Sequence, residues 1–161
     1  MTYLGVGAFQ GCRGLTNITI GKGIRSIENY TFSDCRGLTS ITLPDRLDYI
    51  GEGAFSCCYN LTSINIPDGV VGIGMGAFSG CPLTSITIPN KVSWIESYAF
   101  DCSTLTSIYC KATTPPEGSK DMFPNNASDL KIYVPTESVD AYKAADYWVK
   151  YANHIIGYDF E

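Results

Sequence analysis

A phenylalanine returns along this sequence at nearly constant spacing, and other residues repeat in step with it. The phenylalanines of this series are Phe9, Phe32, Phe55, Phe78 and Phe100. A leucine follows each one, and a pair of mostly apolar residues follows that leucine by three and five positions. Self-similarity with a period of about 20 to 50 residues is typical of proteins whose units stack on their neighbours. The sequence therefore predicts a repeat solenoid.

One unit, residues 54–76, shows how a single turn of this solenoid would be built. Apolar and polar residues alternate from Ser63 to Ile66, which predicts a half-buried strand. Pro67 lacks the N–H that a strand ladder needs, so it ends the strand, and Asp68 with the glycine after it forms a turn. Phe55 is then expected to fill the interior of the turn as a large apolar plug.

The seven cysteines of the chain also follow the repeat. Four of them stand three positions after a repeating phenylalanine, and two more stand two positions after one; these six are Cys12, Cys35, Cys58, Cys81, Cys57 and Cys102. Cys110 takes an apolar strand position. Cysteine packs as a small hydrophobe, so we expect a stack of buried thiols. Pairing between stacked neighbours stays open, but an odd count excludes complete pairing within the chain.

The pattern of residues 1–110 resembles the BspA-like (treponemal-type) leucine-rich repeats. Five units match Leu-x-x-Ile-x-Ile-Pro, followed by Val-x-x-Ile-Gly, Ala-Phe and Cys, as in residues 61–81. The resemblance implies a mainly β, right-handed coil with units of about 23 residues. It also implies a bacterial protein that is secreted or displayed on the cell surface, and that adheres to an extracellular protein or glycan.

The remaining residues, 111–161, are predicted to form a degenerate sixth repeat and a C-terminal cap. Phe123 follows Phe100 at the spacing of the repeat, and a sixth strand is expected from Leu130 to Val134. Thr136 would cap a helix whose apolar stripe covers the last coil; the stripe comprises Val139, Tyr142, Ala145, Trp148 and Val149. The stretch also resembles the C-terminal ends of BspA-like proteins. The sequence thus divides into a solenoid, 1–110, and a cap, 111–161.

The first residues match the tail of a repeat, because Leu4 occupies the position of Ile27 in the next unit. They lack the basic and apolar composition of a signal peptide, and we expect a chain that begins within a repeat of a longer protein. A solenoid end without a polar cap exposes apolar surface. The sequence therefore predicts self-association through the N-terminal coil.

Composition and motifs argue against several classes of function. Residues 1–110 carry six basic and eight acidic side chains and the rest carries five and eight, so no basic surface for nucleic acid or anionic lipid is expected. No apolar run is long enough to insert into a membrane. His154 is the only histidine, and the glycines of residues 72–76 lack the spacing of a nucleotide loop. We therefore expect no enzyme, cofactor or metal site.

The outward positions of the predicted strands are the candidate binding residues. They stack into two polar columns, which are Asn17, Ser40, Ser63, Ser85 and Ser107, and Thr19, Thr42, Asn65, Thr87 and Tyr109. Serine and threonine ladders also stabilise strands directly, so a purely structural spacer is the alternative. Aromatic residues near the cap form a second candidate surface, comprising Tyr133, Tyr151 and Tyr158.

Overall fold

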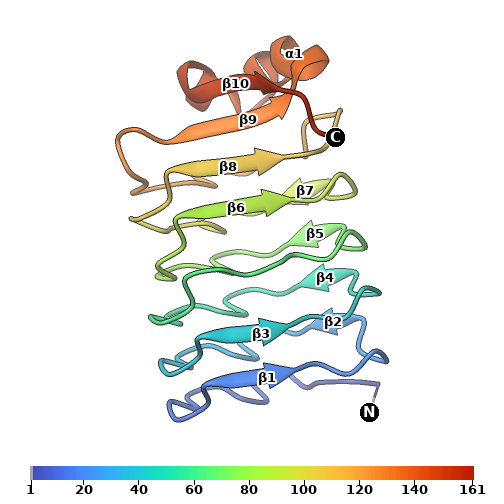
Figure 1. Cartoon of the computed structure of the whole chain (residues 1–161), viewed down its shortest axis with the longest axis vertical. Coiled ribbons are helices and arrows are strands. Elements are labelled where there is room, and N and C mark those ends of the chain that lie inside the picture. The colour runs from blue at the N-terminus through green and yellow to red at the C-terminus, as the bar shows by residue number, and fades with distance from the viewer. Residues whose placement is uncertain (1) are drawn as a thin grey trace.

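The computed structural model describes residues 2–161 as a stack of turns with two columns of parallel strands (Figure 1). The first column is broken into two sheets, β1(Asn17–Thr19) with β3(Ser40–Thr42), and β6(Ser85–Ile88), β8(Ser107–Cys110), β9(Lys131–Pro135) and β10(Ile155–Tyr158). The second column comprises β2(Ser26–Ile27), β4(Tyr49–Ile50), β5(Gly72–Ile73) and β7(Trp94–Ile95). The parallel strands and the small share of helix are those of a leucine-rich repeat fold.

The register of both columns follows the sequence period. Ile18 pairs with Ile41 in the first column, and Ile27 pairs with Ile50 in the second, at a separation of one repeat in each case. Parallel strands need a long connection, and here the rest of each turn supplies it. The second column belongs to the Val-x-x-Ile-Gly part of the repeat, where the sequence predicted only buried apolar positions.

One predicted strand is absent. Residues 63–66 keep the alternation of burial, with Ser63 and Asn65 exposed and Ile66 buried, but no strand is assigned to them. The flanking sheets therefore end at Thr42 on one side and begin at Ser85 on the other. The next unit is shortened by one position at Pro82, and proline cannot donate to a ladder. The sequence period therefore predicted which side chains of this segment are buried, but it did not predict that the segment lacks the hydrogen bonds of a strand.

The repeating phenylalanines form one continuous stack through the interior. Ring centroids from Phe9 to Phe100 are 5.3–5.5 Å apart, with interplanar angles of 5–9°. Phe123 extends the stack at 5.8 Å from Phe100, which confirms that the repeat continues beyond residue 110. Four of these rings are fully buried: Phe32, Phe55, Phe78 and Phe100. The prediction of internal plugs is confirmed, and the aromatic stack adds dispersion contacts between neighbouring turns.

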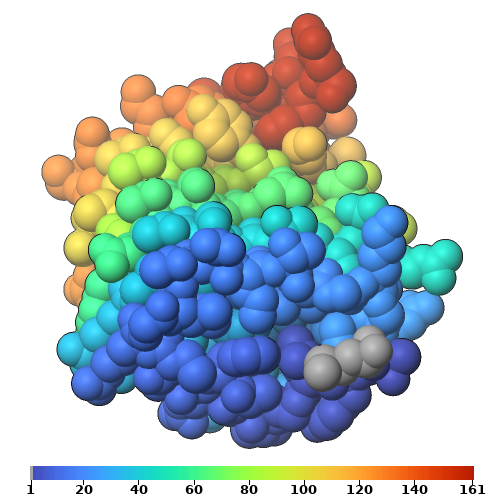
Figure 2. All heavy atoms as spheres, turned by 60° about the horizontal axis from the view of Figure 1, so that its bottom comes forward, coloured from blue at the N-terminus to red at the C-terminus, as the bar shows by residue number. Residues whose placement is uncertain are grey.

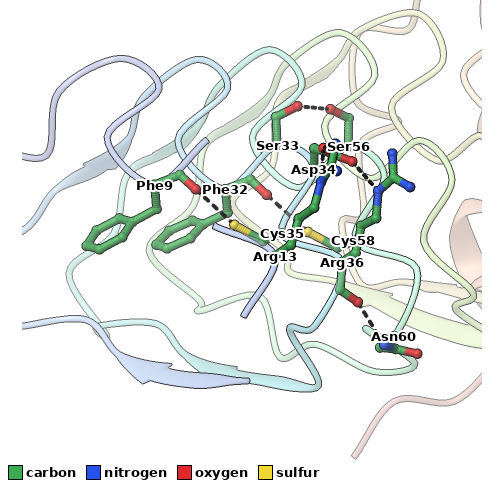
Figure 3. A network of polar contacts seen from close by, with 10 residues as sticks. All are labelled: Phe9, Arg13, Phe32, Ser33, Asp34, Cys35, Arg36, Ser56, Cys58 and Asn60. Atoms are coloured by element: carbon green, nitrogen blue, oxygen red, sulfur yellow. Dashed lines mark hydrogen bonds and ion pairs between the residues drawn. The ribbon is translucent and has the colours of Figure 1, made fainter. Parts of the chain in front are cut away.

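Cysteine thiols link each of these turns to the one before it (Figure 3). Cys35 donates from Sγ to the carbonyl oxygen of Phe9 at 3.0 Å, and Cys58 does so to Phe32 at 3.2 Å. The same contact recurs from Cys81 and Cys102 at 3.1 and 3.2 Å. The expected burial is confirmed for these four and for Cys110, but it is wrong for Cys12, which is exposed, and Cys57, which is half-buried.

Beside the thiols, charged side chains join consecutive turns at the surface (Figure 3). Asp34 accepts from Arg36 at 2.6 Å and from Arg13, one turn earlier, at 2.8 Å. These two guanidinium groups lower the pKa of the Asp34 carboxyl. Exposed ion pairs stabilise a fold only weakly, so this cluster orients the corner rather than holding the stack together.

The C-terminal cap contains less helix than the sequence predicted. α1(Val139–Ala144) is preceded by the 3-10 turn η1(Thr136–Ser138) and followed by η2(Val149–His154). Thr136 is not the helix cap, because its hydroxyl donates to Asp159 Oδ1 at 2.7 Å. Residues 145–148 leave the helix, so the predicted helix ends earlier than the apolar stripe does.

Two buried side chains of the cap close the stack. The Tyr142 hydroxyl donates to the Ala112 carbonyl at 2.7 Å, and the Trp148 indole donates to the Pro116 carbonyl at 2.8 Å. Both residues are fully buried, which confirms their predicted role over the last coil. Val149 is 58% exposed, so its place in the predicted stripe is wrong. The predicted sixth strand is confirmed as β9, shifted by one position.

Candidate binding surface

The first block of the candidate surface lies on β1 and β3. Asn17 pairs with Ser40 and Thr19 pairs with Thr42, and all four side chains are exposed. The inward residue between them, Ile18, packs against the core. The alternation that predicted these outward positions therefore produces two short polar columns, as expected.

The second block lies on β6 and β8, where Ser85 pairs with Ser107 and Thr87 pairs with Tyr109. Ser85 and Thr87 are exposed, whereas Ser107 and Tyr109 are half-buried. Ser63 and Asn65 lie between the blocks and are exposed, but outside any assigned strand. The structure thus brings the ten predicted residues to one face in two strand-paired groups and an unpaired middle segment.

An aromatic cluster ends this face at the cap. The rings of Tyr109 and Tyr133 stack at 4.7 Å with an interplanar angle of 11°. Tyr158 meets the edge of both rings at 5.6 Å, and Phe160 meets Tyr158 at 4.9 Å. Ile156 pairs with Tyr133 in the sheet and is 40% exposed. We call these five residues the aromatic cluster.

The aromatic cluster joins the two surfaces that the sequence treated separately. Tyr109 belongs to a polar column, whereas Tyr133 and Tyr158 belong to the predicted surface near the cap. Tyr151 does not join them, because it is buried and its hydroxyl oxygen accepts from the Phe123 N–H at 3.2 Å. Its selection as an exposed aromatic residue was wrong.

Sequence reasoning missed Ile156 and Phe160 because it did not predict β10. A signal was present, since Ile155 follows Ile132 at the spacing of the repeat and pairs with it in the sheet. The period therefore continues through the cap into one more strand. The strand β10 was not predicted because the apolar stripe of the helix indicated a cap in which the repeat had already ended.

The surroundings of the aromatic cluster are polar and of mixed charge. A shallow hollow of about 280 Å³ lies beside it, between Lys111, Glu137 and the rings of Tyr158 and Phe160. Tyr158 is 43% exposed, which leaves apolar area available to a partner. Exposed aromatic residues with a polar rim are the composition of binding hot spots.

Within residues 2–161, no group of three or more potential metal-ligating side chains gathers. The ring nitrogen Nδ1 of His154 lies 2.8 Å from the carbonyl oxygen of Leu130, so this histidine has a structural partner. No helix in the described part of the chain is long and apolar enough to cross a membrane.

An apolar groove lies at the N-terminal end of the stack, which faces the viewer in Figure 2. The groove has a volume of about 160 Å³ and is lined mainly by apolar side chains, among them Leu4, Phe9, Ile18, Ile20 and Ile24. Leu4, Ile20 and Ile24 are themselves buried. Phe9 and Ile18 are only partly buried, in contrast to Phe55 and Ile86 of later turns.

Comparison with known proteins assigns the fold to a family. The family model of the BspA type leucine rich repeat region matches in six copies, over residues 1–107 and 25–143. The chain belongs to this family. A comparison with curated proteins finds no match.

Three solved structures of bacterial proteins are similar to this chain. A leucine-rich repeat protein from Bacteroides ovatus is 32% identical, with a TM-score of 0.61 over 81% of this chain. The pneumococcal vaccine antigen PcpA is 26% identical, with a TM-score of 0.76 over 96%. A leucine rich cell surface protein from Faecalibacterium prausnitzii is 31% identical, with a TM-score of 0.63 over 73%. The matches cover 42%, 38% and 31% of those chains, respectively.

Proposed function

We propose that this chain is a non-catalytic binding module of a bacterial cell-surface or secreted protein, and that it adheres to an extracellular protein or glycan through its strand face. The observation that carries the proposal is the gathering of Tyr109, Tyr133 and Tyr158 at the end of the polar columns. Tyrosine combines a large apolar area with a hydroxyl and few rotatable bonds, which suits an anchor in an interface. The surface localisation of a similar protein supports it.

The proposal includes the finer architecture that the sequence indicates. The stack is a right-handed solenoid of five clear units, followed by a sixth degenerate unit and a cap, with the boundary after residue 110. The ten residues of the polar columns contribute hydrogen bonds around the aromatic anchor. No cofactor, nucleic acid or membrane lipid is required for binding.

Binding is tested on the intact parent protein by adhesion to immobilised host cells. One variant combines Tyr109→Ala with Tyr133→Ala, and another combines Thr42→Arg with Thr87→Arg. A control carries Asp45→Arg and Asp68→Arg in exposed turns. We expect adhesion to fall at least tenfold in both strand-face variants and to persist in the control. Protease treatment of the host cells abolishes adhesion to a protein, and periodate oxidation abolishes adhesion to a glycan.

The alternative is a structural spacer that projects another domain from the cell surface. The near-identical polar residues of the two columns favour it, because serine and threonine ladders stabilise strands without any ligand. Unchanged adhesion of both strand-face variants, with all variants folded, would support the spacer and exclude the strand face.

A further inference from the structure

The second strand column lies across each turn from the first column, and it carries one aromatic pair. The rings of Tyr49 on β4 and Trp94 on β7 lie 5.4 Å apart with an interplanar angle of 38°. The two strands are not neighbours, because β5 lies between them. The indole reaches Tyr49 by crossing Gly72 of β5, where an added Cβ would lie 2.1 Å from two indole carbons. The absent side chain at Gly72 therefore creates the space for this aromatic platform.

Three half-buried glutamates lie beside the platform: Glu28, Glu52 and Glu96. Ser26, Tyr49, Gly72 and Trp94 are in register across the column, and Glu28 and Glu96 follow Ser26 and Trp94 by two residues, which is the same face of the sheet. A Cβ added at Gly74 would lie 2.7 Å from the Glu52 nitrogen and 3.0 Å from the Tyr49 hydroxyl oxygen, so the Glu52 backbone lies beside that hydroxyl. Burial raises the pKa of the Tyr49 phenol, and the negative charges of all three glutamates raise it further.

These carboxylates are held by neutral donors rather than by cations. Glu28 accepts from the Ser26 hydroxyl, Glu52 from the Tyr30 hydroxyl, and Glu96 from the Met75 N–H at 2.8 Å. None of the four ion pairs within residues 2–161 includes any of the three glutamates. The donors fix the positions of the carboxylates and leave their charge uncompensated.

Apolar side chains border the platform, and the guanidinium group at the edge of this column is already paired. Arg25, at the edge of this column, is paired with Asp48 at 3.1 Å. Val71 is 42% exposed and Met75 is 43% exposed. A ligand that fits this surface must therefore be cationic and must also have an extended apolar or planar part.

We propose that the Tyr49–Trp94 platform, with Glu28, Glu52 and Glu96, binds an arginine side chain of a partner protein. A guanidinium group stacks on aromatic faces and donates hydrogen bonds in a planar fork that matches a carboxylate. Charge-assisted bonds of this kind are stronger than those between neutral groups. The site lies on the second strand column, so it is separate from the strand face and does not depend on the function proposed for that face.

The probe for this site is the peptide acetyl-Gly-Arg-Gly-Arg-Gly-amide, titrated into the full chain at low ionic strength. Calorimetry measures the affinity, and tryptophan fluorescence reports on the site because Trp94 is partly exposed while Trp148 is buried. We expect saturable binding that weakens at least tenfold in Trp94→Ala and at least threefold in Glu96→Gln. Trp94→Phe keeps an aromatic ring and should retain most of the affinity.

Three controls separate the site from general attraction between opposite charges. Glu137→Gln removes an exposed carboxylate of the cap, and Tyr109→Ala removes part of the aromatic cluster, so neither should change the affinity. A peptide with glutamine in place of arginine should not bind. Urea denaturation confirms that each variant is folded.

The proposal is overturned if the arginine peptide does not bind, or if Glu96→Gln and Glu137→Gln weaken it equally. It is also overturned if the glutamine peptide binds as well as the arginine peptide, because apolar contact alone would then explain the affinity. Displacement of the peptide by millimolar Ca²⁺ in the wild type but not in Glu96→Gln would overturn it in favour of a cation site formed by the carboxylates.

Discussion

The side chain of Cys58 donates a hydrogen bond from Sγ to the backbone carbonyl oxygen of Phe32, one turn earlier, at a distance of 3.2 Å. The same oxygen accepts from the N–H of Cys35 within its own turn at 3.3 Å. The Phe32 carbonyl oxygen thus accepts one hydrogen bond within its own turn and one from the following turn. The repeat of this arrangement explains why cysteine and phenylalanine recur together at the same spacing.

Cys58→Ala should lower the free energy of unfolding by about 1–3 kcal/mol, because it removes a buried hydrogen bond and leaves a small cavity. Cys12→Ala is the matched control, since Cys12 occupies the same repeat position but is exposed. It should change the stability by less than about 0.5 kcal/mol. Urea denaturation measures both. Equal losses in the two variants would mean that the thiol contact contributes nothing.

Phe55→Ala should lower the free energy of unfolding by about 3–5 kcal/mol, because it removes a fully buried ring from the stack. Thr42→Ala, at an exposed position of β3, should be nearly neutral. Thermal and urea unfolding of both variants give the comparison. A small effect of Phe55→Ala would contradict the role of the phenylalanines as internal plugs.

Stability should decrease at alkaline pH because of the buried thiols. Burial raises the pKa of Cys35 and Cys110 to about 11 and that of Cys102 to about 12. In the unfolded chain a thiol ionises at about pH 8.5. The folded state therefore holds more protons above that pH, and the free energy of unfolding falls as the pH rises from about 8.5 toward 11–12.

Cys102→Ala tests the origin of this pH dependence. Urea midpoints between about pH 8 and pH 11 should show a slope that is shallower than that of the wild type by up to about 1.4 kcal/mol per pH unit. Thr42→Ala should keep the wild-type slope, because it removes no titratable group. An unchanged slope in Cys102→Ala would assign the alkaline loss to other groups.

Gly37→Ala should destabilise the protein by about 1–3 kcal/mol, because its Cβ would lie 2.4 Å from the carbonyl oxygen of Arg13 in the previous turn. Gly14 holds the equivalent position one repeat earlier, and an added Cβ there meets no atom within 4 Å. Gly14→Ala should therefore be neutral or slightly stabilising. Unfolding midpoints that shift equally in both variants would show that the turns are not packed this closely.

Self-association through the N-terminal groove is expected at high protein concentration. Ile18→Asp places a charge in this groove and should keep the chain monomeric, whereas Asp159→Lys on the cap should not. Sedimentation velocity over a wide concentration range measures the state of each. A wild type that stays monomeric throughout would contradict the prediction.

Most of the fold could be predicted because the repeat determines which side of the chain is buried. Phe123 and Ile132 were located from the period alone, and both are buried where predicted. The helix was less predictable, since Tyr142 and Trp148 do face the core but are separated by irregular backbone after the short helix ends. Apolar spacing reports burial, and several backbone paths can satisfy the same burial.

The candidate surfaces were also predictable in part: the sequence located the outward strand residues but not the contacts between turns. Alternation along the strands located Thr42 and Thr87, because a strand side chain that is not buried must point outward. The contact between Tyr49 and Trp94 was not predictable, since it requires that Gly72, between them, leave room for an indole. Such a contact depends on which side chains become neighbours across turns and on their rotamers.

By itself, the sequence determined the leucine-rich repeat fold, the phenylalanine stack and the outward columns, because each depends on a pattern within one repeat. Only the tertiary structure decided the thiol–carbonyl bonds between turns, the missing strand at residues 63–66, the aromatic cluster and the platform over Gly72. These features depend on the distance and orientation between neighbouring turns. That geometry is set when the turns pack together, and no single repeat specifies it.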